Sequence, residues 1–351
     1  MLPTVSTAVR LERIPYDAEE WDAIVAAHPE AEVFHGAPWF DFLSATQGAE
    51  PVVAVVRLDG RTVGHFAGAI VQRYGVRILG SPLRGWSTQC MGFLLEEGID
   101  RRAAAEALLP LAFGELGCVH VELADRHLTN EQMNGASYER ESGTTLRIDL
   151  TASEDEIFSR FRKTTRWEIR RAVRIGLQTE VATDEAFADE YYRYLQETFQ
   201  RQGLAPTYGA DRVRSLMDAL QSTGQLVLLR VRAPDGRLLA TSLSVGRART
   251  AVLWGIAFDR SNREYHPVEL LWWETIRAWR DAGAEVFDVG GGGDYKAKYG
   301  GVAMPTVHFH RSRWPFLTVA RSTMRELVRV RQRVVARRGT GAGRDPDAVV
   351  R

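Results

Sequence analysis

The sequence predicts an α/β fold of two tandem domains, each built on a mixed sheet, and two observations lead to this expectation. The first is a repeated order of elements, because each half of the chain reads as helices, an antiparallel meander, a helix and a strand. The second is size and composition: 351 residues, 45% apolar and 26% charged, suffice for two soluble domains of ordinary size. We expect the domains over residues 1–145 and 146–312, facing each other across a cleft.

The first half begins with a helix over residues 17–29, because Asp17 precedes acidic residues and the apolar residues that follow keep helical spacing. A hairpin is expected at Asp59 and Gly60, since this dipeptide favours a tight turn between two strands. The other elements expected here are a short helix over 34–45, strands within 51–80, a helix over 101–116, and strands over 118–125 and 144–150.

The second half begins with a capping box, Ser153 with Glu156, which predicts a helix that runs to about Ile175. A later helix should begin at Pro267 and end at Gly283, since these residues are favoured at helix starts and ends. The other elements expected in this half are helices over 185–200 and 211–222, a meander over 225–231, 238–245 and 250–258, and a strand over 285–289.

The C-terminal tail has a different composition. Residues 313–338 read as one basic amphipathic helix, which can lie on an anionic membrane, on RNA or on its own domain. Residues 339–351 are rich in Gly, Arg, Pro and Asp, a composition typical of disorder.

Charge and motif content exclude several classes of protein. Forty-five basic and forty-five acidic residues give no net charge, which argues against a uniformly basic nucleic-acid binder. No apolar run is long enough to span a bilayer and no export signal opens the chain, so we expect a cytoplasmic protein. The two cysteines, Cys90 and Cys118, fit buried apolar positions, and we expect no metal site.

Residues 284–301, AEVFDVGGGGDYKAKYGG, are the stretch most suggestive of chemistry. A strand ending near Asp288 leads into four glycines, and Lys296 and Lys298 follow between Tyr295 and Tyr299. Glycines let the backbone approach a ligand closely, and lysines beyond them can meet negative charge that develops in a reaction. We therefore expect the centre of an acyl-transfer reaction here, with alternation placing both lysines on one side. The alternative is a flexible connection.

A second basic segment lies near residue 165. Lys163, Arg166, Arg170 and Arg174 are spaced by three and four residues, so they share one face of a helix whose other face is apolar. This face suits a phosphate-bearing substrate, and a solubilising surface is the alternative.

Three ordered stretches within residues 150–310 resemble the FemAB/FemX peptidyltransferases of the GNAT superfamily. They are FRKTTRWEIRRAVRIG, then GIAFDRSNREYHPVELLWWETIRAWRDAG, then FDVGGGGDYKAKYGG. The family pattern N-x-x-Y-x-P falls on Asn262, Tyr265 and Pro267, and its F-K-x-x-F-G pattern falls on residues 295–300. The resemblance implies two tandem GNAT-like domains, although the N-terminal half matches only in outline.

The resemblance also implies a reaction. FemAB-like enzymes transfer an amino acid from aminoacyl-tRNA to an amine of a peptidoglycan precursor, without a covalent enzyme intermediate or a tightly bound cofactor. Their motif lysine, Lys296 here, stabilises the tetrahedral oxyanion, a role that suits a positive group aimed at developing charge. Tyr265 and Asp288 are expected to shape the acceptor pocket, and Lys163, Arg166 and Arg170 to receive the donor or a phosphate. The other residues expected to bind substrate are Tyr295, Lys298 and Tyr299.

Two departures leave the substrates open. The windows where the family holds the phosphates of a muramyl peptide, residues 42–47 and 203–208, contain no Lys or Arg. Coenzyme A users carry a glycine-rich loop, whereas FDRSNREYHPV has no glycine and Pro267 lacks an amide proton.

Three functions therefore remain. The first is an N-acyltransferase that uses an aminoacyl-tRNA or acyl-CoA donor and an amine acceptor such as a cell-wall precursor. The second is an acyl-CoA-dependent acetyltransferase acting on a sugar amine or small metabolite. The third is a non-catalytic module that binds RNA or anionic lipid through its basic helices. The oligomeric state is not predicted.

Overall fold

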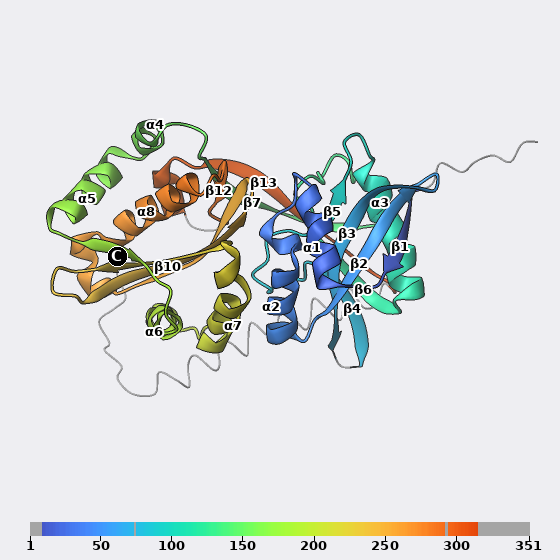
Figure 1. Ribbon diagram of the computed structural model, residues 1–351, viewed down its shortest axis with the longest axis horizontal. Helices are drawn as coiled ribbons and strands as arrows, with labels where there is room; N and C mark the ends of the chain where they lie inside the picture. The colour runs from blue at the N-terminus through green and yellow to red at the C-terminus, as the bar shows by residue number, and fades with distance from the viewer. Residues whose placement is uncertain (1–8, 74, 292–293, 315–351) are drawn as a thin grey trace, which may run out of the picture.

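The computed structural model describes residues 9–73, 75–291 and 294–314 (Figure 1). Its strands form one sheet in the order β1-β2-β3-β4-β6-β13-β7-β12-β11-β10-β9-β8, and β5 pairs with β3 outside this path. We refer to residues 9–138 as the N-terminal half and to residues 139–314 as the C-terminal half. Figure 1 shows the two halves side by side, with β13 extending from one into the other.

The N-terminal half contributes strands β1 to β6 and three helices. The strands are β1 (Arg10–Ile14), β2 (Glu50–Leu58), β3 (Arg61–Arg73), β4 (Val76–Ser81), β5 (Gly92–Leu95) and β6 (Cys118–Leu123). The helices are α1 (Ala18–Ala27), α2 (Ala37–Gln47) and α3 (Arg101–Pro110), with short turns η1 (Val33–His35) and η2 (Leu111–Glu115).

The C-terminal half contributes β7 to β13 and five α-helices. The strands are β7 (Glu139–Asp149), β8 (Gln178–Val181), β9 (Leu226–Arg232), β10 (Leu238–Arg247), β11 (Thr250–Phe258), β12 (Val286–Asp288) and β13 (Val302–Ser312). The helices are α4 (Glu154–Ser159), α5 (Lys163–Arg174), α6 (Ala186–Arg201), α7 (Ala210–Leu220) and α8 (Pro267–Asp281), with short turns η3 (Gln221–Thr223), η4 (Arg260–Tyr265) and η5 (Asp294–Tyr299).

The two halves repeat one arrangement, as the order of elements predicts. In the N-terminal half β2, β3 and β4 form an antiparallel meander, and β6 returns parallel to β4 after α3. In the C-terminal half β9, β10 and β11 form the meander, and β12 returns parallel to β11 after α8. This confirms the predicted α/β fold of tandem, mixed-sheet units.

Strand β13 joins the halves into a continuous sheet. Its C-terminal residues pair with β6, and most of its length pairs with β7, both antiparallel. The predicted domain junction at residues 145–146 lies inside β7, so the division into two domains stays a prediction.

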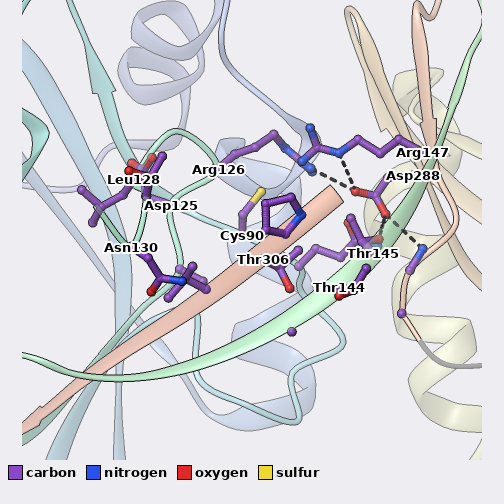
Figure 2. Close-up of a pocket in the computed structure, with 18 of the residues that line it drawn as sticks. Cys90, Asp125, Arg126, Leu128, Asn130, Thr144, Thr145, Arg147, Asp288 and Thr306 are labelled. Atoms are coloured by element: carbon purple, nitrogen blue, oxygen red, sulfur yellow. Dashed lines mark hydrogen bonds and ion pairs between the residues drawn. The ribbon is translucent and has the colours of Figure 1, made fainter. Parts of the chain in front are cut away.

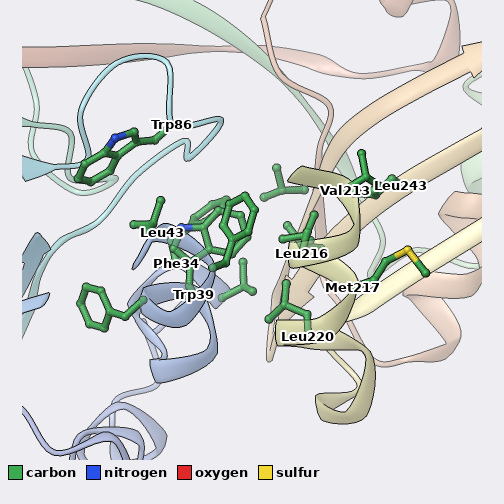
Figure 3. Close-up of a cluster of buried hydrophobic side chains, with 14 of the residues drawn as sticks. Phe34, Trp39, Leu43, Trp86, Val213, Leu216, Met217, Leu220 and Leu243 are labelled. Atoms are coloured by element: carbon green, nitrogen blue, oxygen red, sulfur yellow. The ribbon is translucent and has the colours of Figure 1, made fainter. Parts of the chain in front are cut away.

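An apolar cluster holds the two halves together beside the sheet. Figure 3 shows α2 facing α7, with aromatic side chains from the N-terminal half against aliphatic side chains from the C-terminal half. Trp39, Phe42 and Leu216 are fully buried there. Full burial of one large apolar side chain contributes about 1.5–3 kcal/mol, so this cluster favours a fixed junction.

The prediction of one helix from Ser153 to Ile175 is wrong, because the structure has two helices here. The capping box forms as predicted, but α4 ends at Ser159 and α5 begins at Lys163. Arg162 between them has non-helical backbone, and its amide donates to the carbonyl of Lys298 at 2.9 Å. A tertiary hydrogen bond therefore replaces the helical one.

The predicted tail elements, a helix over 313–338 and a disordered segment over 339–351, lie outside the described residues apart from Arg313 and Trp314. Within the described part of the chain, no helix has the length and apolarity that a membrane span requires. Both cysteines are free and buried, as predicted.

Candidate functional site

Asp288 is the centre of the polar contacts at the end of β12. Its carboxylate is fully buried and accepts four hydrogen bonds: from Thr145 Oγ1 at 2.5 Å, Gly290 N at 3.0 Å, Arg126 Nη1 at 3.0 Å and Arg147 Nε at 3.3 Å (Figure 2). Burial raises the pKa of Asp288, but the Arg126 charge and the hydrogen bonds together have the larger, opposite effect. The net shift of the pKa is therefore downward. An ionised carboxylate with four donors is suited to organising the site rather than to accepting a proton.

Arg126 connects this carboxylate to the N-terminal half. It follows β6, and besides Asp288 it donates to Glu32 through Nε and, at 2.7 Å, through Nη2. Both Glu32 and Asp288 are almost completely buried, while the Arg126 side chain is 13% exposed. Burial raises the pKa of Glu32, but the charge and hydrogen bonds of Arg126 together with His35 and Cys90 lower it more, so the net shift is downward and Glu32 is ionised. We call Glu32, Arg126 and Asp288 the ion chain.

Lys296 lies next to this carboxylate on the short turn η5. Its ammonium donates to the backbone carbonyls of Val289 at 2.7 Å and Gly291 at 3.1 Å. Burial lowers the pKa of Lys296, and the nearby Asp288 charge opposes part of that shift. Because an ammonium has three N–H donors, one remains for a further acceptor.

A pocket of about 680 Å³ opens beside Arg126 and Asp288, between the two halves, and Lys296 is not among the residues that line it. Figure 2 shows Asp125, Leu128 and Asn130 on one side of it, and Arg147 and Asp288 on the other. Other lining residues come from β7, β13 and the glycine loop: Thr144, Thr145, Thr306, Gly290 and Gly291.

The predicted substrate-binding residues take different positions. Asp288 lines the pocket, whereas the Tyr299 ring is buried and stacked on Trp272 with the centroids 4.3 Å apart. Tyr295 is exposed, and Tyr265 is half-buried against the core of the C-terminal half. Their roles in binding substrate stay predictions.

The expectation that both lysines point the same way is wrong. Residues 294–299 form a 3₁₀ helix instead of a strand, so the alternation of side chains does not apply. The Lys298 ammonium pairs with Glu269 of α8 at 2.7 Å, while Lys296 faces the glycine loop.

The basic segment forms α5, outside the pocket lining. Lys163 and Arg170 are exposed, and Arg166 is half-buried. Trp167 meets the ring of His266 edge-on at 5.7 Å, which places α5 beside the start of α8. Binding of a donor or phosphate by this face stays a prediction.

The loop before α8 makes its own hydrogen bonds. Asp259 accepts from Ser261 N at 2.8 Å and from Asn262 Nδ2 at 2.6 Å, and Pro267 occupies the first turn of α8. Fewer backbone amides are thus available for a pyrophosphate than in a glycine-rich loop.

Glu32, Arg126, Thr145 and Arg147 did not emerge from the sequence analysis. Arg126 and Asp288 are 162 residues apart, and neither Glu32 nor Arg126 lies in a recognisable motif. The one local signal is the alternation of β7, which places Thr145 and Arg147 on the same face.

Comparison with known proteins agrees with this geometry. Residues 159–299 match the family model for the acetyltransferase (GNAT) domain. No curated protein matches the sequence. Among solved structures, FemX shares 14% identity, with 86% of this chain and 97% of FemX covered and a TM-score of 0.70.

Two further solved structures have the same fold at lower similarity. A tandem GNAT protein from the clavulanic acid biosynthesis pathway shares 14% identity over 87% of this chain and 99% of its own, with a TM-score of 0.54. L-PGS from Bacillus licheniformis shares 10% identity over 86% and 94%, with a TM-score of 0.51.

Residues 159–299 are thus similar to GNAT-type acetyltransferase domains, and the fold of the described chain is similar to that of FemX and of a tandem GNAT protein. This confirms the predicted resemblance and supports the general class of acyltransferase. Neither the acyl donor nor the acceptor follows from the comparisons, and none of them supports an aminoacyl-tRNA donor.

Proposed function

We propose that the protein transfers an acyl group from an activated donor to an amine acceptor, with Lys296 stabilising the tetrahedral oxyanion. The observation that carries this proposal is the Lys296 ammonium, held by two carbonyls beside the glycine loop, with its third N–H group not bonded to any described residue. Amide formation from an ester or thioester places negative charge on the carbonyl oxygen, and a fixed positive donor stabilises that charge.

Direct transfer agrees with the chemistry of the pocket walls. Cys90 is the one thiol on the pocket, and its pKa is well above the ordinary value because the thiol is buried next to Glu32. A protonated thiol is a poor nucleophile. The amine therefore attacks the donor carbonyl itself, and the thiolate or alkoxide leaves with the proton that the amine loses.

Acyl-CoA is the donor that the family description favours, since the matched domain is that of acetyltransferases. With Asp259 and Pro267 limiting the loop amides, we propose that cationic side chains hold the donor phosphates instead. Lys163 and Arg170 on α5 are exposed beside the start of α8, and Arg263 on η4 is exposed as well. An aminoacyl-tRNA donor and a cell-wall acceptor remain the competing proposal.

The test is transfer by the purified protein, with acetyl-CoA or aminoacyl-tRNA as donor and a panel of amines as acceptors, followed by mass spectrometry. Lys296→Ala should lower kcat by roughly 10²–10³, the usual effect of losing one oxyanion donor. Lys298→Ala is the matched comparison, because it removes the same charge two residues away and should lower kcat far less. Equal activity of Lys296→Ala and wild type would exclude the role of Lys296 in the proposal, whereas no transfer by wild type with any donor and acceptor would favour a binding module.

A further inference from the structure

The pocket contains several charged side chains, most of which are already bonded to one another. Asp125 accepts from the amides of Phe93 and His127, both at 2.8 Å, and from Arg101 Nη1 at 3.1 and 3.2 Å. Arg126 and Asp288 belong to the ion chain. These groups shape the pocket but offer little free hydrogen-bonding capacity to a ligand.

Arg147 is the exception among the charged residues around Asp288. Only its Nε is bonded, to Asp288, and within the described part of the chain Nη1 and Nη2 have no hydrogen bond. Its side chain is 24% exposed and lines the pocket. Figure 2 shows Arg147 beside Arg126 at the wall opposite Asn130. A guanidinium edge with free N–H groups binds a carboxylate or phosphate in two parallel hydrogen bonds.

The balance of charge favours the same type of ligand. Glu32 and Asp288 are balanced by Arg126 and Arg147, so the Lys296 ammonium, which lies behind Gly290, adds one positive charge at this end of the pocket, while Glu131 lines the opposite wall. A cationic group such as a second amine is repelled there, whereas an anion is attracted.

We propose that the acceptor is an amine that also carries an anionic group, a carboxylate or a phosphate, which Arg147 binds. This inference rests on the proposed function. The bound anion holds the acceptor so that its amine reaches the donor carbonyl next to Gly290, Gly291 and Lys296. The anionic group is unchanged in the reaction, which forms the N–C bond and breaks the bond to the leaving group.

The test uses matched pairs of amines that differ only in the anion: glycine with glycinamide, and glucosamine 6-phosphate with glucosamine. Binding without donor is measured by saturation-transfer NMR, and acylation with acetyl-CoA by mass spectrometry. Wild type should favour the anionic member of at least one pair by roughly tenfold or more, as charge-assisted hydrogen bonds imply. The pair that responds distinguishes a carboxylate from a phosphate.

Arg147→Gln should remove this preference and retain the response to the neutral member. Arg147→Lys keeps the charge beside Asp288 and should retain part of the preference, which leaves the test usable if Arg147→Gln fails to fold. The control is Arg61→Gln, which changes an exposed arginine paired with Glu96 and should retain the full preference for the anionic member.

Equal binding of both members of every pair, no binding of any anionic member, or an unaltered preference in Arg147→Gln would each overturn the inference. Failure of the proposed function gives a different result. A protein that binds anionic amines through Arg147 without acylating them keeps this inference and loses the function. A protein that acylates charged and neutral members equally keeps the function and loses the inference.

Discussion

Replacing Arg126 tests whether the ion chain holds the halves in register. Arg126→Met keeps the length of the apolar stem and removes the guanidinium, so Glu32 loses its charged partner and Asp288 keeps three of its four donors. Removing one partner of a buried ion pair costs about 3–5 kcal/mol of folding free energy. We expect a loss in this range near neutral pH, measured by urea unfolding with tryptophan fluorescence.

The dependence on pH has a defined sign. In wild type the folded pKa values of Glu32 and Asp288 lie below their ordinary values, so their contribution to stability is present at neutral pH and lost as pH falls through the folded pKa. In Arg126→Met, burial without the counter-charge should raise the pKa of Glu32, and stability then falls as pH rises. The difference from wild type should therefore be smaller at about pH 4.5 than near neutral pH, by up to about 1.4 kcal/mol per pH unit for one proton.

Two further variants complete the test. Adding Glu32→Gln to Arg126→Met should recover part of the loss, since no buried charge is then left unpaired at Glu32; a coupling of about 0.5–3 kcal/mol is expected. Arg61→Met breaks an exposed pair with Glu96 and should cost at most about 1 kcal/mol. A loss below about 1 kcal/mol in Arg126→Met, or an equal loss at both pH values, would refute the reasoning.

Two more predictions concern the segment around Lys296. Because burial lowers the pKa of Lys296 while Asp288 raises it, the basic limb of the pH profile of kcat should lie below the ordinary lysine value of 10.5, and Asp288→Asn should move it lower; a limb that Asp288→Asn leaves in place contradicts this. Gly300→Ala should destabilise the protein more than Gly283→Ala in thermal unfolding. Both glycines have positive φ, but the added Cβ at Gly300 would lie 2.8 Å from Arg160 Cβ, and at Gly283 nothing lies within 4 Å; equal losses would show that this contact is unimportant.

Much of the fold follows from local signals. The Ser153 and Glu156 capping box, the turn at Asp59 and Gly60 and the start of α8 at Pro267 form where the sequence predicts them. Each depends on residues a few positions apart, whose preferences for backbone geometry are strong. The break between α4 and α5 could not be predicted in this way, because it depends on a hydrogen bond from Arg162 to a carbonyl 136 residues later.

The residues of the site likewise fall into those that local sequence predicts and those that only tertiary structure brings together. Lys296 and Asp288 lie in one short motif, so their proximity follows from the sequence, whereas Glu32 and Arg126 meet Asp288 only through tertiary structure. One sequence signal supports Lys296 independently of the motif. Three of the chain's 45 basic residues are lysines, at 163, 296 and 298. A compact ammonium with three donors fits between the two carbonyls, whereas a planar guanidinium presents its donors in a different, fixed geometry.

The site depends on more of the chain than the matched domain. Residues 159–299 include Lys296, the glycine loop and Asp288, but Thr145 and Arg147 lie before this segment and the β13 residues of the pocket wall lie after it. The N-terminal half supplies the opposite wall at residues 124–131 and, through Arg126, the main counter-charge of Asp288. Asp288 also accepts a hydrogen bond from Gly290 N. The contact between Arg126 and Asp288 therefore helps to position the glycine loop, whose carbonyls hold Lys296. In the proposed reaction the N-terminal half, which lacks the lysine motif, would therefore contribute by fixing the position of the residues around Asp288.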